Sequence, residues 1–472
     1  MPQEPDPTTL TAPKGSPKLH FSLDVRFPVY ALAWINDETL VLAGGGGGSR
    51  TGVRNRISIY RVSPSTRTLT LLHSHTLSSA EDAPMTIAPY LPAHALVAGI
   101  NSAPDELARG TNDNLRVFEY AGLDAEGGVK ERDAVEEQVK VEEKRRKQTL
   151  KAADPDQYQK ITAFTRPPPS NSHTADATAS SRPALVALGS TNAQLSLLNW
   201  PELDDVYPPI SFARDGGFEG RKEGQKKEDD EEVIDVDFDD SGEMLIGTSS
   251  TRLAIYPTTR SPYISRPPEP LQVIERPVLK KEMKCTFRAA KFGRRETASH
   301  LYTVVNAAPL IPSSLSQKQR KAFEKKAPKK AFVSLWDTAT WTLVKTRTVC
   351  QKPVTCFEVS DDGELLAYGG SDLSVGVISA RTLRPIVTIL HAHDFPVTAL
   401  KFNPAGTVLV SGSADNSVRV ITVPRDGSTT SSSSSATTTY ALLVTLLILL
   451  IAVVVQMGLG DEVLRAARGA GL

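Results

Sequence analysis

One strand pattern recurs seven times between Pro28 and Val423, and it limits this chain to very few folds. Each copy has an apolar strand, a turn, an apolar run that ends in small residues, a second turn and an alternating strand. The two clearest copies begin at Val354 and Val397, 43 residues apart. A period of about 40 to 45 residues is typical of the four-stranded blades of β-propellers. The sequence therefore predicts an all-β fold, a seven-bladed β-propeller, with six or eight blades as the alternatives.

The five weaker copies keep the same order of strands and turns. They begin at Tyr30, Met85, Ile161, Val233 and Phe287. The copy that begins at Phe287 contains SLWDT, residues 334–338, with a Trp-Asp dipeptide where WD repeats carry it. We therefore expect the blades to be WD repeats.

A propeller also needs a closing strand, because an open ring leaves unpaired strand edges exposed. No strand pattern follows Val423, whereas KLHFSLD, Lys18–Asp24, alternates apolar and polar residues ahead of the first copy. We predict that this segment pairs as the outer strand of the last blade.

The C-terminal part differs in composition from the repeats. Tyr440–Gly460 has no charged residue across 21 positions. A helix of that length spans the roughly 30 Å hydrocarbon layer of a bilayer. Gly427–Thr439, just before it, is rich in Ser and Thr, a composition typical of a flexible tether. Because the N-terminus is too polar for a signal peptide, the sequence predicts a tail-anchored protein whose propeller is in the cytosol.

The predicted organisation has five parts along the chain. They are a disordered N-terminus at 1–17, the β-propeller at 18–426, the tether at 427–439, one C-terminal transmembrane α-helix at 440–460 and a short luminal tail at 461–472.

Three charged segments add length to the repeats. Gly122–Lys160 contains EEQVKVEEKRRK, which is either a charged helix or a solvated insertion. Ala213–Glu232 has the composition of a loop. The basic run Lys318–Lys330 is either a surface loop or a segment that faces anionic lipid.

Composition and motifs argue against several functions. Lys and Arg number 54, as do Asp and Glu, so the net charge gives no support to nucleic-acid binding. The three cysteines form no metal or disulfide pattern, and no set of acid, base and nucleophile typical of a hydrolase is present. His393 has no third ligand at metal spacing; we expect it to form hydrogen bonds within its blade, with Ser413 and Asp415 as partners.

The feature left unexplained is AGGGGGSRTGVRN, Ala43–Asn55, which lies between two predicted strands of the first blade. It matches neither the Walker A spacing nor Gly-x-Gly-x-x-Gly, and a strand follows it where a phosphate site needs a helix. Glycine lets the backbone adopt positive φ and approach a partner closely. Several glycine carbonyls can therefore turn toward one weakly hydrated cation such as potassium. The alternative is a loop that only connects the two strands.

The glycine loop, the WD-repeat propeller and the C-terminal anchor together resemble the endoplasmic-reticulum guanine nucleotide exchange factors that activate Sar-family small GTPases, the family of the prolactin regulatory element-binding protein. The resemblance implies nucleotide exchange on the GTPase without covalent chemistry, at the start of coat protein complex II vesicle formation. It also implies that the protein is a single-pass protein of the endoplasmic-reticulum membrane, in ER-Golgi transport.

The resemblance carries over to the loop residue by residue. It implies that the backbone carbonyls of five glycines bind potassium: Gly44, Gly45, Gly46, Gly47 and Gly48. Two further loop residues, Ser49 and Thr51, are implied to support the ion. The resemblance implies that the catalytic residues are Arg50, Gly52, Val53 and Asn55. The family usually has Lys where Arg50 stands and Ile where Val53 stands. Val53 is expected to act as an apolar wedge, and Asn55 to fix the loop or meet the partner backbone, while Arg50 and Arg54 contact acidic partner surface.

Two other functions remain open at this point. A tail-anchored propeller scaffold would bind partners and leave nucleotide release unchanged. A nuclear DNA-binding role, which the mammalian relative's name suggests, conflicts with the predicted membrane span and the balanced charge.

Overall fold

The structure, a computed structural model, describes residues 8–15, 17, 19–48, 52–123, 131–132, 135–136, 138–150, 156–166, 183–213, 231–259, 266–278, 283–312 and 314–424. Seven antiparallel sheets follow one another along the chain, each starting with a strand at the centre of a ring. Every inner strand contacts the inner strand of the next sheet, and the last contacts the first. The predicted seven-bladed propeller is therefore confirmed, and each predicted copy begins within two residues of an inner strand or inside it.

The strands of each blade run from the centre of the ring outward. The inner strands are β3 (Val29–Trp34), β7 (Thr86–Tyr90), β13 (Gln159–Phe164), β17 (Asp235–Phe238), β21 (Met283–Phe292), β25 (Val354–Val359) and β29 (Val397–Phe402). The second strands are β4 (Thr39–Gly44), β8 (Ala95–Gly99), β14 (Leu185–Ser190), β18 (Met244–Thr248), β22 (His300–Pro309), β26 (Leu365–Gly370) and β30 (Val408–Ser413). The third strands are β5 (Arg56–Ser63), β9 (Leu115–Ala121), β15 (Gln194–Asn199), β19 (Arg252–Pro257), β23 (Lys330–Asp337), β27 (Val375–Ser379) and β31 (Ser417–Thr422). The outer strands are β6 (Thr68–Thr76), β12 (Lys140–Lys147), β16 (Ile210–Ser211), β20 (Gln272–Glu275), β24 (Thr342–Cys350), β28 (Pro385–Ile389) and β2 (His20–Asp24).

The small residues that end the second strands allow the blades to pack against each other. A Cβ on Gly189 would lie 2.7 Å from a methyl of Val233, which stands just before the inner strand of the next blade. Cβ atoms on Gly369 and Gly412 would lie 2.7 Å and 2.6 Å from the valines that begin the following inner strands. Because protein interiors are close-packed, this position must stay small. The repeated sequence pattern thus reflects the contact between blades.

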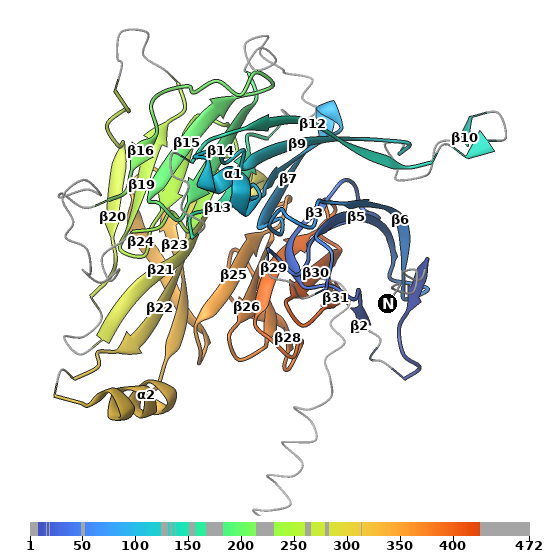
Figure 1. The fold of residues 1–472 in the computed structure, drawn as a ribbon. Helices are drawn as coiled ribbons and strands as arrows, with labels where there is room; N and C mark the ends of the chain where they lie inside the picture. The colour runs from blue at the N-terminus through green and yellow to red at the C-terminus, as the bar shows by residue number, and fades with distance from the viewer. Residues whose placement is uncertain are drawn as a thin grey trace, which may run out of the picture. The chain divides into compact units, whose positions relative to one another are not determined.

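The N-terminal segment closes the ring as predicted. β2 pairs antiparallel with β31, from His20 opposite Ile421 to Asp24 opposite Ser417, and the two strands lie side by side in Figure 1. Phe21 is 3% exposed and its apolar side chain joins the core between the first and last blades. The disordered N-terminus expected at 1–17 is wrong in part, because β1 (Thr9–Thr11) pairs with β6 as a fifth strand of the first blade.

The charged segment at 122–160 is also different from the prediction. Its basic and acidic residues Lys140–Lys147 form β12, the outer strand of the second blade, and not a helix. This blade would otherwise lack a fourth strand, and alternation buries Val141 while charged neighbours face solvent. Charged side chains are typical of edge strands, where they disfavour pairing with other chains. β10 (Glu131–Arg132) and β11 (Val135–Glu136) form a separate two-stranded sheet.

The described helices are short. α1 (Pro104–Ala108) connects β8 to β9. α2 (Gln317–Lys326) connects β22 to β23 and covers most of the basic run, for which the sequence left a surface loop and a lipid-facing segment as alternatives. In Figure 1, α2 stands out from the blades. Single 3₁₀ turns form at Leu91–Ala93 and Arg295–Thr297.

Residues 1–423 form one compact unit and residues 424–472 a second. In the part of the chain that the structure describes, no helix is long and apolar enough to cross a membrane. The predicted tether, membrane span and luminal tail at 427–472 lie outside that part.

Strand direction decides which loops share a face of the propeller. Strands alternate in direction within each antiparallel blade. The connections from second to third strand and from each outer strand to the next inner strand therefore emerge on one face. The glycine loop between β4 and β5 lies on this face, with the β6–β7 connection beside it.

Candidate functional site

The glycine loop joins β4 to β5 in the first blade. Gly44 is still part of the sheet, where it pairs with Val29 and with Arg56. The loop proper begins at Gly45, whose N–H donates to the carbonyl of Pro28 at 3.0 Å. Ser49, Arg50 and Thr51, which the sequence assigned to the site, lie outside the described residues.

The glycines of this loop are needed for different reasons. Gly44 packs so closely that a Cβ would lie 1.9 Å from the carbonyl oxygen of Pro28. Gly45 has φ +143°, and its Cβ would lie 2.3 Å from Asn55 Oδ1. Gly47 has φ +69°, in the left-handed region that favours glycine. Gly48 has open space around it. Packing and backbone conformation therefore exclude a side chain at the start of the loop and not at Gly48.

Asn55 fixes the loop from within. Its side chain is buried, with 3% of the residue exposed. Asn55 Oδ1 accepts a hydrogen bond from Gly47 N–H at 2.9 Å, and Nδ2 donates to the Gly47 carbonyl at 3.3 Å and to the Glu81 carbonyl at 2.8 Å. Of the two roles expected for Asn55, this geometry favours fixing the loop, because its amide is already bonded within the chain.

The second blade contributes the other side of the site. Gly48 N–H donates to Asp82 Oδ1 at 3.1 Å, and Leu77 N–H donates to the Asn55 carbonyl at 2.9 Å. The Glu81 side chain turns away from the loop and lies 2.8 Å from the Arg116 guanidinium. Burial alone would raise the pKa of Glu81, but its bonds to Arg116 and Arg146 hold that pKa below its usual value. Glu81 is thus a carboxylate held in an ion pair.

The loop presents its far end to solvent. Gly48, Gly52 and Arg54 are exposed. Val53, the predicted wedge, is half-buried and packs against the apolar core between the first and seventh blades. Gly46 N–H also donates to the Val53 carbonyl at 3.3 Å, which links the two arms of the loop. Val53 therefore has a packing role in this chain, and only part of its surface is open to a partner.

The groups that the glycines of the loop can offer to a cation are backbone carbonyls. Positive φ at Gly45 and at Gly47 changes the direction of the peptide groups next to each of them. A Cβ on Gly47 would lie 3.1 Å from an oxygen of the Asp82 carboxylate. Among the described residues no cluster of three His, Cys, Asp or Glu side chains could hold a metal ion. Neutral carbonyl oxygens are the ligands that weakly hydrated potassium prefers.

Sequence reasoning did not find the residues of the second blade that hold the loop. Glu81 and Asp82 follow Asn55 by 26 and 27 positions, and Arg116 and Arg146 come from two further strands. No motif marks them, because their place beside the loop depends on how two blades pack.

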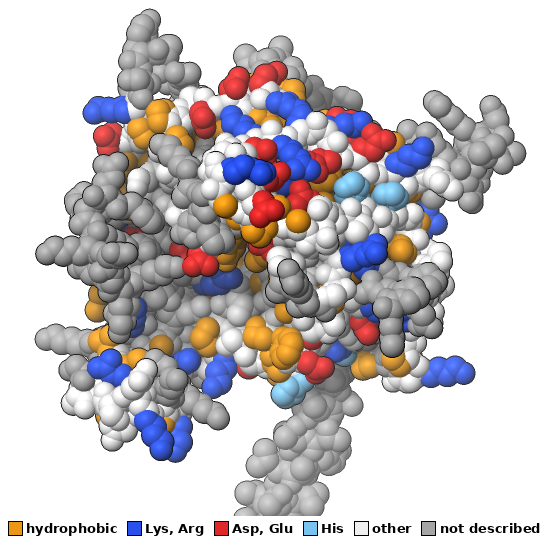
Figure 2. Space-filling view, in the orientation of Figure 1, with side chains coloured by type: hydrophobic (Ala, Val, Ile, Leu, Met, Phe, Trp, Pro, Cys, Tyr) orange, Lys and Arg blue, Asp and Glu red, His pale blue; other side chains and the backbone are white. Residues whose placement is uncertain are grey.

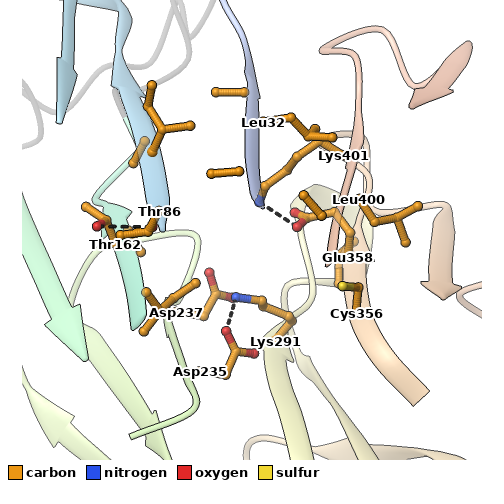
Figure 3. Close-up of a pocket in the computed structure, with 18 of the residues that line it drawn as sticks. Leu32, Thr86, Thr162, Asp235, Asp237, Lys291, Cys356, Glu358, Leu400 and Lys401 are labelled. Carbon is orange, nitrogen blue, oxygen red and sulfur yellow. Dashed lines mark hydrogen bonds and ion pairs between the residues drawn. The ribbon is translucent and has the colours of Figure 1, made fainter. Parts of the chain in front are cut away.

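The central channel is a second candidate site. The inner strands enclose a cavity of about 580 Å³. Lys291 Nζ lies 2.6 Å from Asp235 Oδ1, and Lys401 Nζ lies 2.5 Å from Glu358 Oε2, as Figure 3 shows. Each pair joins the inner strands of neighbouring blades. Since these charges neutralise one another, the channel is better explained as a fastening of the ring than as a site for chemistry.

His393 lies within the seventh blade, as expected. Its Nδ1 and Nε2 are each 2.8 Å from a serine hydroxyl, those of Ser417 and Ser411, and Asp415 Oδ2 is 3.3 Å from Nδ1. The expected partner Asp415 is confirmed, but Ser413 is wrong, because its hydroxyl donates to the carbonyl of Phe395. Burial lowers the pKa of His393, so the imidazole is neutral.

Comparisons with known proteins find a WD repeat and relatives that are similar along most of the chain. The WD domain, G-beta repeat model matches residues 384–422. The putative guanine nucleotide-exchange factor SED4 of Candida glabrata is 21% identical over 409 residues, covering 85% of this chain and 32% of that protein. The guanine nucleotide-exchange factor SEC12 of the same yeast is 21% identical over 415 residues, covering 87% of this chain and 73% of that protein.

A solved structure, the WD40 β-propeller domain of Doa1, aligns with 85% of this chain and 94% of that chain, with a TM-score of 0.49 and 11% identity. The chain spans about a third of the length of SED4 and about three quarters of the length of SEC12. Along most of its length the chain is therefore similar to proteins named as Sec12 and Sed4 guanine nucleotide-exchange factors.

Proposed function

We propose that this protein is a guanine nucleotide-exchange factor that activates a Sar-family small GTPase at the endoplasmic-reticulum membrane, at the start of coat protein complex II vesicle formation. The relatives named as exchange factors support nucleotide exchange in general. The observation that carries the proposal for this chain is the glycine loop, a connection whose close packing and positive φ favour glycine and which the buried Asn55 fixes.

Exchange requires that the factor bind the nucleotide-free GTPase more tightly than the loaded one, because only differential affinity shifts the equilibrium. A loop held rigidly in one conformation favours this, since less conformational entropy is lost when the partner binds. Asn55 and the Asp82 carboxylate hold Gly47 and Gly48, and the segment Gly52–Arg54 then meets the GTPase. Arg54 is exposed and contacts acidic partner surface, while the open part of Val53 forms the apolar contact.

Potassium is the cofactor that we propose for the loop. The carbonyl oxygens of the glycines would hold the ion, which supplies positive charge that stabilises the loop conformation. Gly44 and Gly47 contribute less freely than the others, because Gly44 lies in the sheet and the Gly47 carbonyl already accepts from Asn55.

A membrane anchor at 440–460 completes the proposal. It rests on the 21 uncharged residues Tyr440–Gly460 and on the Ser/Thr-rich segment before them. Anchoring would keep the propeller beside the membrane and raise its effective concentration for a GTPase that also binds there.

The test is release of a fluorescent guanine nucleotide from a Sar-family GTPase with catalytic amounts of residues 1–426. This fragment contains the complete ring, because all seven blades close between His20 and Thr422. We expect acceleration by the wild-type fragment, in potassium more than in sodium, and loss of acceleration in Val53→Asp and Arg54→Glu.

Two controls separate a functional effect from misfolding. Arg54→Glu changes a side chain that is exposed, so its unfolding midpoint should match the wild type. Arg381→Glu reverses an exposed arginine in the β27–β28 connection, on the opposite face, and should exchange nucleotide normally. If the folded wild-type fragment binds the GTPase without accelerating release, the protein is a scaffold and the proposal is wrong.

A further inference from the structure

One short segment outside the first blade forms three hydrogen bonds with the described part of the glycine loop. Residues 77–82, between β6 and β7, provide the Leu77 N–H, the Glu81 carbonyl and the Asp82 carboxylate. These groups lie 2.8 to 3.1 Å from their partners in the loop. The order of the loop therefore depends in part on this segment.

The segment itself has no regular secondary structure to hold it. Glu81 N–H donates to the Ser78 carbonyl at 3.2 Å, and Ser78 N–H donates to Glu81 Oε2 at 3.2 Å, which makes a closed turn. Asp82 N–H donates to the Asn101 carbonyl at 3.2 Å. Hydrogen bonds at this distance lie at the long end of the usual range, so the turn needs a further attachment.

Arg116 provides that attachment. It lies on β9 with its side chain fully buried, and its Nη1 is 2.8 Å from Glu81 Oε1. Its Nε donates to the Asp113 carbonyl at 2.6 Å, which fixes the plane of the guanidinium. Arg146 on β12 approaches the same Glu81 oxygen at 3.2 Å from the outer side. Figure 2 shows basic and acidic side chains interspersed over β9 and β12.

The arginine is not explained by stability alone. Its Nη2 is buried without a hydrogen-bond partner among the described residues. Burying a guanidinium is costly, and an apolar residue of similar volume is often as stabilising as a buried ion pair. A long apolar side chain would fill the site between the strands, but it would remove the buried partner of Glu81 and leave the half-exposed Arg146 on the same oxygen. The retained charge points to a requirement for the position of Glu81.

We infer that Arg116 and Glu81 form a positioning pair that sets the conformation of the glycine loop from the neighbouring blade. Arg116 holds the Glu81 carboxylate, Glu81 holds the 77–82 turn, and the turn holds Asn55 and Gly48. Its effect on nucleotide exchange rests on the proposed function, whereas its effect on loop order does not.

The experiment measures amide hydrogen exchange of the glycine loop in residues 1–426. Gly47 and Gly48 donate to Asn55 and Asp82, so their amides report whether the loop is held. In Arg116→Met we expect exchange of these amides to rise by about tenfold or more, because the loop opens locally while the blades stay folded. Glu81→Gln, which keeps the shape and the bond to Ser78, should give a smaller rise and serves if Arg116→Met does not fold.

Two further variants distinguish positioning from space filling. Arg116→Lys keeps a positive charge toward Glu81, so loop protection should be partly restored relative to Arg116→Met. Arg145→Met is the matched control: Arg145 lies on β12 beside Arg146, but it donates to the carbonyls of Pro201 and Glu202 in the third blade. Unchanged exchange in both Arg116→Met and Glu81→Gln, or an equal rise in Arg145→Met, would overturn the inference.

Nucleotide release is measured on the same variants. Arg116→Met should lower the maximal acceleration more than Arg145→Met does. If the wild type gives no acceleration, the proposed function fails, while the hydrogen-exchange result still decides whether the pair positions the loop.

Discussion

Substitution of two glycines in the same loop gives the sharpest test of how the loop is built. Gly45→Ala places a Cβ 2.3 Å from Asn55 Oδ1 and 2.5 Å from its Cα, at a φ of +143°. Gly48→Ala places a Cβ where nothing lies within 4 Å. The chemical change is identical, so any difference between the two variants comes from the position.

The magnitude follows from two effects. An alanine held at a φ that L-residues avoid costs about 2 kcal/mol. Asn55 must move away from the new methyl, which breaks its two bonds with Gly47 and costs about 1 kcal/mol for each. The total is about 4 kcal/mol against the native loop, and Gly48→Ala should change its stability by less than about 0.5 kcal/mol.

Hydrogen exchange and denaturant unfolding measure this difference. A penalty of about 4 kcal/mol lowers the population of the native loop by roughly a thousandfold relative to open forms. We expect the loop amides of Gly45→Ala to exchange as if unprotected, with a lower unfolding midpoint if the β4–β5 sheet is disturbed. Gly48→Ala should match the wild type in both. Equal protection in the two variants would refute the conclusion that Gly45 and Asn55 pack too closely for a side chain.

Two further outcomes concern the rest of the propeller. Because burial lowers the pKa of His393 from 6.5, the stability that its neutral form contributes is present above about pH 6.5 and is lost as the pH falls. The unfolding free energy of the wild type should therefore approach that of His393→Asn as the pH falls below about 6.5, and a constant difference would contradict this. Removing residues 1–25 deletes β2 with the buried Phe21 and Leu23, so residues 26–426 should be about 4 kcal/mol less stable than residues 1–426 and should associate at high concentration. Residues 18–426, which lack only β1 and the segment around it, should behave like residues 1–426 in light scattering and denaturant unfolding.

The fold was readable from the sequence where side-chain pattern and blade geometry impose the same requirement. Val397 marks an inner strand because it must be apolar and must meet Gly369 of the preceding blade. β12 was not predicted, since EEQVKVEEKRRK has helix-forming charged residues and its strand form depends on an edge left free by β9. Tertiary context overrides local preference at such edges.

The candidate site likewise contains residues that could be predicted from the sequence and residues that could not. The glycines stand out because a run of glycine is rare in a short connection, whereas Asn55 was named from the family resemblance alone. Glu81 and Arg116 do not stand out, because their role exists only when the second blade packs beside the first. Of the two partners predicted for His393, Asp415 was correct and Ser413 was wrong. The hydroxyls that bond to its ring are those of Ser411 and Ser417.

The pairing of β2 with β31 has a consequence for biosynthesis. Synthesis of the roughly 390 residues between these strands takes about 20 to 80 s at about 5 to 20 residues per second. During that time β2 has no partner, and the inner strand of the first blade lacks the seventh blade against which it packs. Edges exposed for so long can pair with other chains. Correct closure of this ring therefore competes with association of the nascent chain until its seventh blade has been made.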